Sequence, residues 1–149
     1  MSSKPYSVSG GYSAMELAAS GLTAERGRMN VIASNLANAR TTRTANGTPY
    51  QRLDPVFTAT EVAPTSSDPV LRAMREVQLT GVQPDTTPGE MVYDPGHPDA
   101  NQQGYVTYPN VNVVTEMVNL MTASRAYEAG VTSIESLKAM ARSALKIGT

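Results

Sequence analysis

Apolar residues recur at alternating spacings of three and four along two long segments, one near each end of the chain. The first segment runs from about residue 12 to 39 and the second from about 112 to 147. Such spacing puts the apolar side chains on one face of an α-helix and is typical of helices that pack on other helices. The predicted helix-packing positions are Met15, Ala18, Leu22, Met29, Ile32, Leu36, Val113, Met117, Leu120, Tyr127, Val131, Ile134, Ala141 and Leu145.

Local signals mark where both predicted helices begin. Ser13 followed by Glu16 matches an N-terminal capping box, so we expect the first helix to start there and residues 1–11 to be flexible. Asn112 is a suitable N-terminal cap for the second helix.

Neither helix is expected to be stable alone. Gly21 and Gly27 interrupt the first helix, and each costs about 1 kcal/mol relative to alanine. At 1.5 Å per residue the second helix is roughly 50 Å long, more than a compact domain of this size requires. Much of the apolar surface therefore needs other helices to cover it.

The middle of the chain has a different composition. Residues 40–111 hold nine of the ten prolines, which excludes a long helix there, so we expect strands and loops. Residues 50–60 and 77–81 have strand character, and residues 91–93 are expected to pair with residues 105–108. Residues 63–68 are polar and are predicted to form a mobile connection.

These elements define a mainly α fold with a small β insert. The N- and C-terminal helices are predicted to pack as an antiparallel coiled coil, with a β-rich module between them. The expected organisation is a flexible N-terminus (1–11), a discontinuous helical domain (12–39 plus 112–147), and a β-rich insert with extended loops (40–111).

Composition and charge exclude several classes of protein. Twelve basic and 13 acidic residues leave a net charge of −1, so neither nucleic acid nor an anionic membrane surface is an expected partner. The chain has no cysteine, which excludes disulfides and thiol chemistry. No segment resembles a cleavable signal peptide or is apolar enough for direct membrane insertion.

The sequence gives little support for an enzyme. The common phosphate-binding, zinc-helix and nucleophile-elbow motifs are absent, and we predict no catalytic residue, cofactor or metal site. The single histidine, His97, lies in a loop with Asp94, Asp99 and Asn101, which together could surround a divalent ion. The spacing does not match an EF-hand, and no second His or Cys supports zinc. We favour a structural loop whose Asp and Asn side chains bond to their own backbone.

Two groups of residues carry a more specific signal. The runs 21–26 and 29–38, with Thr41-Thr42, resemble the N-terminal signature of bacterial flagellar rod and hook proteins, and the loop from residue 93 to 106 is similar to that of the proximal-rod members. Residues 41–44 read Thr-Thr-Arg-Thr where hook and distal-rod relatives have Thr-Gly-Phe. The motif positions are Ser34, Asn35, Leu36, Asn38, Thr41, Asp94, Pro95, Gly96, His97, Pro98, Asp99 and Asn101.

The resemblance implies a structural subunit of the proximal rod, which polymerises through its terminal helices into the shaft that transmits torque to the hook. It also implies other rod subunits and basal-body components as partners, self-association, a periplasm-spanning location, and passage through the flagellar type III export apparatus without signal cleavage. Two alternatives remain at this point: a soluble helical adapter or chaperone that binds another protein's helix, and an ion-binding protein that uses the His97 loop.

Overall fold

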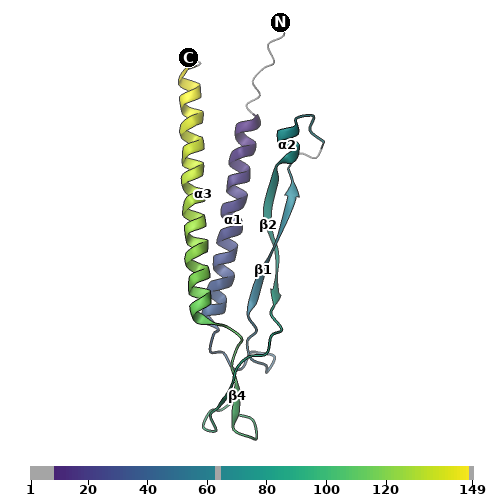
Figure 1. Ribbon diagram of the computed structural model, residues 1–149, viewed down its shortest axis with the longest axis vertical. Coiled ribbons are helices and arrows are strands. Elements are labelled where there is room, and N and C mark those ends of the chain that lie inside the picture. The colour runs from purple at the N-terminus through teal and green to yellow at the C-terminus, as the bar shows by residue number, and fades with distance from the viewer. Residues whose placement is uncertain (1–8, 63–64, 148–149) are drawn as a thin grey trace.

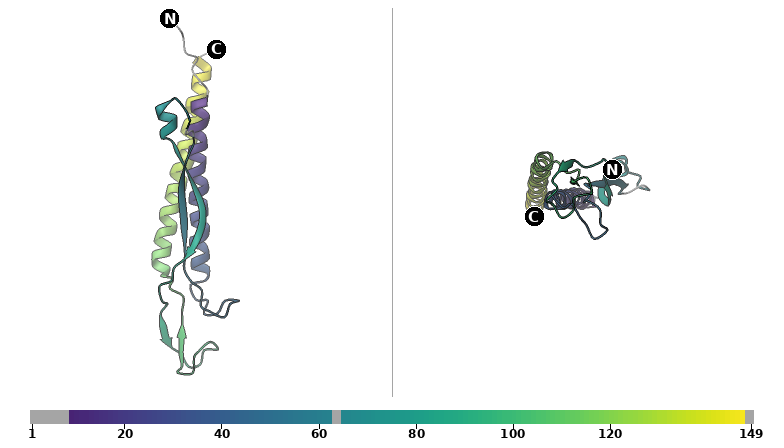
Figure 2. Two further views of the ribbon diagram at one scale, coloured as in Figure 1. Left: turned by 90° about the vertical axis from the view of Figure 1, so that its right-hand side faces the viewer. Right: turned by 90° about the horizontal axis from the view of Figure 1, so that it is seen from below.

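Two long helices dominate the computed structural model, which describes residues 9–62 and 65–147 (Figure 1). The helices lie side by side and run in opposite directions, and a two-stranded ribbon follows the first of them (Figures 1 and 2). A second, shorter pair of strands forms the far end of the molecule. In chain order the elements are α1 (Ser9–Ala37), β1 (Leu53–Glu61), α2 (Pro69–Ala73), β2 (Arg75–Pro84), β3 (Met91–Tyr93), β4 (Tyr105–Thr107) and α3 (Val113–Ile147).

The fold class is confirmed at this level, with helices at both ends and a small antiparallel strand module between them. The start of α1 differs from the prediction, because the helix begins at Ser9 and so includes residues 9–11, which were expected to be flexible. Ser13 is inside the helix and is not its cap. The remainder of the predicted flexible segment, residues 1–8, lies outside the described residues.

The start of α3 agrees with the sequence. The side-chain oxygen of Asn112 accepts a hydrogen bond from the Thr115 amide at 3.0 Å, and its carbonyl accepts one from the Glu116 amide at 2.9 Å. The first bond satisfies one of the amide groups that a helix leaves unpaired at its first turn, and the second is the first bond of the helix itself.

The middle segment forms two separate sheets. β1 and β2 pair antiparallel along their full lengths, with an irregularity between Val56 and Phe57, and β3 pairs with β4 as predicted. The short helix α2 was not predicted: Pro69 occupies its start, and Asp68 accepts a hydrogen bond from the Val70 amide at 2.8 Å. Proline suits the first helical turn because its missing N–H has no helical partner there.

Helix α1 is the central element, since it packs against α3 on one side and against the β1–β2 ribbon on the other (Figure 1). Two glycines allow these close approaches. A Cβ at Gly27 would lie 2.7 Å from Cδ2 of Leu79 on β2, and a Cβ at Gly130 would lie 2.7 Å from Cδ2 of Leu22 on α1. Gly27 therefore allows β2 to pack closely on α1, although glycine destabilises the helix itself.

The single chain buries little apolar surface. Among the described residues, the buried hydrophobic side chains are Ala24, Val31, Ile32, Val106 and Ala123. The exposed surface is 10705 Å², whereas a compact monomer of 15.8 kDa exposes about 7,300 Å². No helix among the described residues has the length and apolar character needed to cross a bilayer. An elongated chain with this much exposed surface is suited to burial between subunits.

Candidate assembly interface

The inward face of α3 holds the two long helices together. Leu120, Tyr127, Val131 and Ile134 lie half-buried on this face, and Ala123 is completely buried. Their spacing of three or four residues keeps them on one side of the helix. On α1 the predicted positions Met15, Ala18, Leu22, Met29 and Leu36 are half-buried, and Ile32 is buried.

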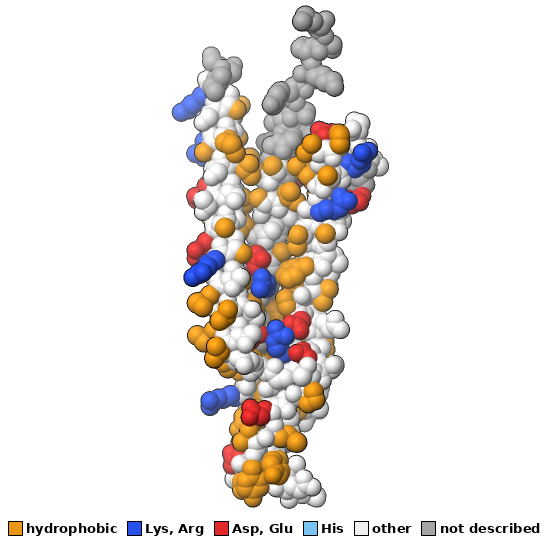
Figure 3. All heavy atoms as spheres, in the orientation of Figure 1, with side chains coloured by type: hydrophobic (Ala, Val, Ile, Leu, Met, Phe, Trp, Pro, Cys, Tyr) orange, Lys and Arg blue, Asp and Glu red, His pale blue; other side chains and the backbone are white. Residues whose placement is uncertain are grey.

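A second apolar face, directed away from α1, occupies the first half of α3. It consists of Val114, Met117, Val118 and Met121, which we call the outer stripe, and these side chains are 51–72% exposed. Positions 114, 118 and 121 follow the same helical spacing as the inward face. Hydrophobic side chains gather over this part of α3 in Figure 3. Exposed apolar patches of this kind mark interaction surfaces.

Some of the predicted helix-packing positions on α3 are thus half-buried, and others are exposed. Val113 and Met117 are exposed at the start of the helix, and Ala141 and Leu145 are exposed near its end. Exposure alone does not assign these four side chains a partner, so their role as contacts with neighbouring subunits stays a prediction.

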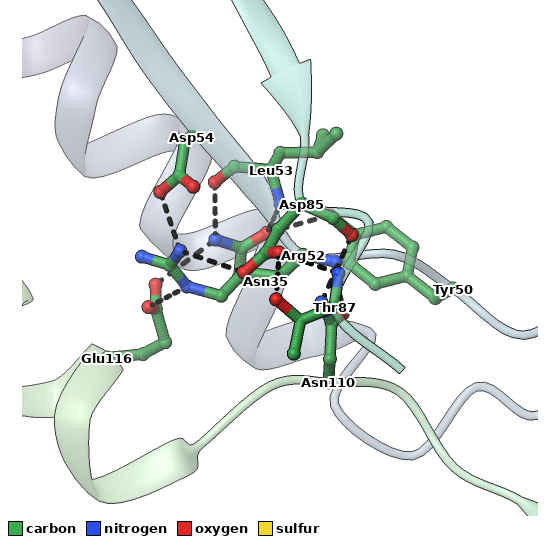
Figure 4. Close-up of polar contacts among 9 residues, drawn as sticks. All are labelled: Asn35, Tyr50, Arg52, Leu53, Asp54, Asp85, Thr87, Asn110 and Glu116. Carbon is green, nitrogen blue, oxygen red and sulfur yellow. Dashed lines mark hydrogen bonds and ion pairs between the residues drawn. The ribbon is translucent and has the colours of Figure 1, made fainter. Parts of the chain in front are cut away.

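A polar junction ties α1, α3 and the middle segment together at the base of the helix pair (Figure 4). Its centre is Asn35, which is 1% exposed. The Asn35 amide nitrogen donates to the Leu53 carbonyl at 2.9 Å and to Glu116 Oε2 at 3.1 Å. Its amide oxygen accepts from the Tyr50 hydroxyl at 3.0 Å and from the Leu53 N–H at 2.9 Å. The hydrogen-bonding capacity of this side chain is fully used.

Glu116 brings a charge into the same junction. Its side chain is 1% exposed, and its Oε1 accepts a charge-assisted hydrogen bond from Arg52 Nε at 2.8 Å. That bond is the main reason that the pKa of the Arg52 guanidinium is raised above its usual value. Arg52 also pairs with Asp54 at 2.6 Å and lies 3.8 Å from Asp85. A buried carboxylate requires such partners, because an unpaired charge there is strongly destabilising.

Backbone contacts extend the junction to the segment between β2 and α3. The Arg52 amide donates to Asn110 Oδ1 at 2.8 Å, and Asn110 Nδ2 donates to the Asp85 carbonyl at 3.1 Å. The hydroxyl and the backbone N–H of Thr87 both donate to the Asp85 carboxylate, which lowers the pKa of that carboxyl. The junction therefore joins four segments that are far apart in the chain.

The residues that close α1 bond mainly to one another. Asn38 Nδ2 donates to the Ser34 carbonyl at 2.9 Å, and Thr41 Oγ1 donates to Asn38 Oδ1 at 3.2 Å. Side chains that compete for backbone groups in this way end helices.

The His97 loop is held by its own backbone and by the segment after α1. Asp94 Oδ1 accepts from the Gly96 amide at 3.2 Å, and His97 Nδ1 accepts from the Asp99 amide at 3.1 Å. Asp99 accepts from Thr42 Oγ1 at 2.8 Å and pairs with Arg43 at 3.5 Å. Within residues 9–62 and 65–147, no three His, Asp or Glu side chains are grouped to hold a metal ion. The contacts agree with a structural loop.

Sequence reasoning missed the outer stripe and the polar junction. The spacing of Val114, Val118 and Met121 could have indicated a second face on α3, but the prediction placed Met117 in a single apolar stripe along the helix. Arg52 had no sequence signal, and Glu116 resembled an ordinary acidic residue in a first helical turn.

The sequences of both terminal helices match known protein families. Residues 15–43 match the family model described as flagella basal body rod protein, and residues 102–147 match the model for the C-terminal part of the flagellar basal body rod FlgEFG proteins. These segments cover much of α1 and all of α3. The chain is thus a flagellar basal-body rod protein by class.

Full-length relatives define the family more narrowly. The flagellar basal-body rod protein FlgC of Borreliella burgdorferi is 41% identical over 146 residues, which cover 91% of this chain and 96% of that protein. FlgC of Escherichia coli O157:H7 is 41% identical over 133 residues (89% and 94%), and FlgC of Bacillus subtilis is 38% identical over 149 residues (92% and 97%). The chain belongs to the FlgC family.

Membership confirms both the rod resemblance and the expectation that the chain is a structural protein and not an enzyme. The comparisons give no support to the two alternatives, a soluble adapter and an ion-binding protein.

Proposed function

We propose that this chain assembles through its terminal helices into the proximal part of the rod, where it helps form the shaft that carries torque from the motor to the hook. The observation that carries the proposal is the outer stripe of α3, four apolar side chains that the single chain leaves uncovered. Burying such side chains contributes about 1.5–3 kcal/mol each, enough to drive association.

In this proposal the two faces of α3 have different roles. The inward face packs on α1 within one subunit in coiled-coil fashion, whereas the outer stripe packs on helices of neighbouring subunits. The polar junction fixes the base of α3, and therefore the direction in which the outer stripe is presented. The His97 loop, through Asp99 and its contacts with residues 42 and 43, holds the strand module where it can meet a neighbour.

The partners are other rod subunits, further copies of this chain, and adjoining basal-body components. The proposed location of the chain is therefore the rod of the basal body, which crosses the periplasm. We also propose that the chain reaches it through the flagellar type III export apparatus without signal cleavage. Weak helices suit that route, because a chain that is ordered mainly by its neighbours is easily kept unfolded during passage.

The proposal is tested by isolating basal bodies from cells that carry a tagged chain and probing them for the tag. We expect the wild-type chain to be present. Met117→Glu should remove it, because a charge placed in the outer stripe cannot be buried against an apolar neighbour. Val70→Glu is the matched control, since Val70 on α2 is an apolar side chain of similar exposure that lies outside the stripe. Equal incorporation of both variants would contradict the role of the stripe.

A further inference from the structure

Strands β3 and β4 lie at the end of the molecule opposite α2 (Figure 1), and they carry an exposed apolar surface. Pairing of Tyr93 with Tyr105 and of Met91 with Thr107 puts these four side chains on one face of the hairpin. Met91 is 67%, Tyr93 63% and Tyr105 42% exposed. We call Met91, Tyr93 and Tyr105 the tip, and hydrophobic side chains are visible at this end in Figure 3.

The tip is preorganised. The rings of Tyr93 and Tyr105 meet edge to face with centroids 5.2 Å apart, and Val106, on the opposite face of the hairpin, is completely buried. Gly104 has a φ of +81°, and a Cβ there would lie 2.8 Å from Cε2 of Tyr93. Aromatic side chains already held in place lose little conformational freedom on binding.

The chain segment that carries the tip has acidic residues but no basic ones. Residues 85–110 contain Asp85, Glu90, Asp94 and Asp99 and no Lys or Arg. Asp85 and Asp99 face Arg52 and Arg43. Glu90 and Asp94 flank β3 and are exposed, and no Lys or Arg of the described residues forms an ion pair with either.

The last part of α3 has the opposite character. Residues 136–147 contain Lys138, Arg142 and Lys146 and no acidic residue, and all three basic side chains are exposed. This helix end lies at the other end of the molecule from the tip (Figure 1). Lysine and arginine bind to the faces of tyrosine rings as well as to carboxylates, so such a surface complements the tip in two ways.

We propose that the tip docks on the basic C-terminal end of the long helix of the next rod subunit. The partner is defined by its chemistry, a helix end with lysines and arginines and without acidic residues, of which α3 of this chain is an example. The contact joins unlike surfaces at opposite ends, so it continues from subunit to subunit along the rod and does not close into a symmetric pair. The inference rests on the proposed function, because it requires the chain to be in the rod.

The test places the photoreactive amino acid benzoylphenylalanine at Tyr93 in the full chain, expressed as the sole copy. Basal bodies are isolated and irradiated, and the cross-linked peptides are identified by mass spectrometry. We expect peptides from the C-terminal helix of a rod subunit that contain Lys or Arg and no acidic residue. The same probe at Thr58, which is exposed on β1 outside the tip, should give different products.

A second test reverses the charge of an acidic residue beside the tip and measures the yield of the same cross-link. Glu90→Lys should lower the yield of that cross-link at least about threefold, because it removes one acidic partner and adds a repulsive charge. Glu128→Lys makes the same change of charge in the middle of α3 and should leave the yield unaltered.

Cross-links to an acidic or uncharged segment or to lipid, or no cross-link from a chain that is present in the basal bodies, would overturn the contact and leave the proposed function intact. Equal effects of the two charge reversals would overturn it as well. Absence of the wild-type chain from the basal bodies would instead contradict the proposed function, and the contact with it.

Discussion

Asn35 is enclosed by four hydrogen-bond partners, none of them a neighbour in sequence. Those partners come from residues 50, 53 and 116, so one side chain on α1 fixes the start of β1 and the base of α3 together. The sequence placed Asn35 in a family motif but indicated no partner for its side chain. Those partners lie up to 81 positions away in the chain, which no local pattern reveals.

Replacing Asn35 by alanine should destabilise the purified chain by about 2–4 kcal/mol, because the replacement leaves buried polar groups of Leu53 and Glu116 unsatisfied. Denaturant unfolding followed by circular dichroism measures this. Asn30→Ala, at an exposed position on the same helix, should change the stability by less than about 0.5 kcal/mol. A loss for Asn35→Ala as small as that of the control would show that the junction contributes little.

At the scale of elements, the two helices and the pairing of β3 with β4 could be predicted, because apolar periodicity and alternation directly reflect which face is covered. Two features could not. Helix α1 starts four residues before the apparent capping box, and α2 is too short for periodicity to show. The division of α3 into two apolar faces was also missed, since the prediction placed the apolar positions of this helix in one stripe, whereas the side chains of the outer stripe are exposed.

Glycines in the helices provide a test of the packing between α1 and α3. Gly21→Ala should stabilise the chain by about 1 kcal/mol, because alanine is the better helix former and no atom lies within 4 Å of the new Cβ. Gly130→Ala receives the same helical gain, but its Cβ would lie 2.7 Å from Cδ2 of Leu22, so the Leu22 side chain must shift and the net stabilisation should be smaller than that of Gly21→Ala. Thermal unfolding compares the two variants. Equal stabilisation by both would mean that the helices do not approach as closely as the structure shows.

The whole molecule is a long, thin body whose surface far exceeds that of a compact chain of its mass. Its apolar outer stripe, its aromatic tip with acidic neighbours, and its basic helix end lie at separate places along that body. The helix pair itself is held by a narrow row of half-buried side chains and one polar junction. This distribution is suited to an assembled state in which neighbours supply much of the missing burial.

Assembly should therefore fail when the inward face of α3 is disrupted. Leu120→Asp or Ile134→Asp places a carboxylate among apolar side chains, and we expect at least a tenfold loss of the chain from isolated basal bodies, with loss of swimming. Leu120→Met keeps the volume and the apolar character, so it should assemble and support motility. Normal rods built from either aspartate variant would refute the assignment of these positions to helix contacts.

The central claim, that this chain is part of the rod, is tested most directly by deleting its gene and examining purified basal bodies by electron microscopy together with motility. The account predicts non-motile cells whose basal bodies lack a rod, and restoration of both by the wild-type chain. Complete flagella in the deletion strain would contradict it.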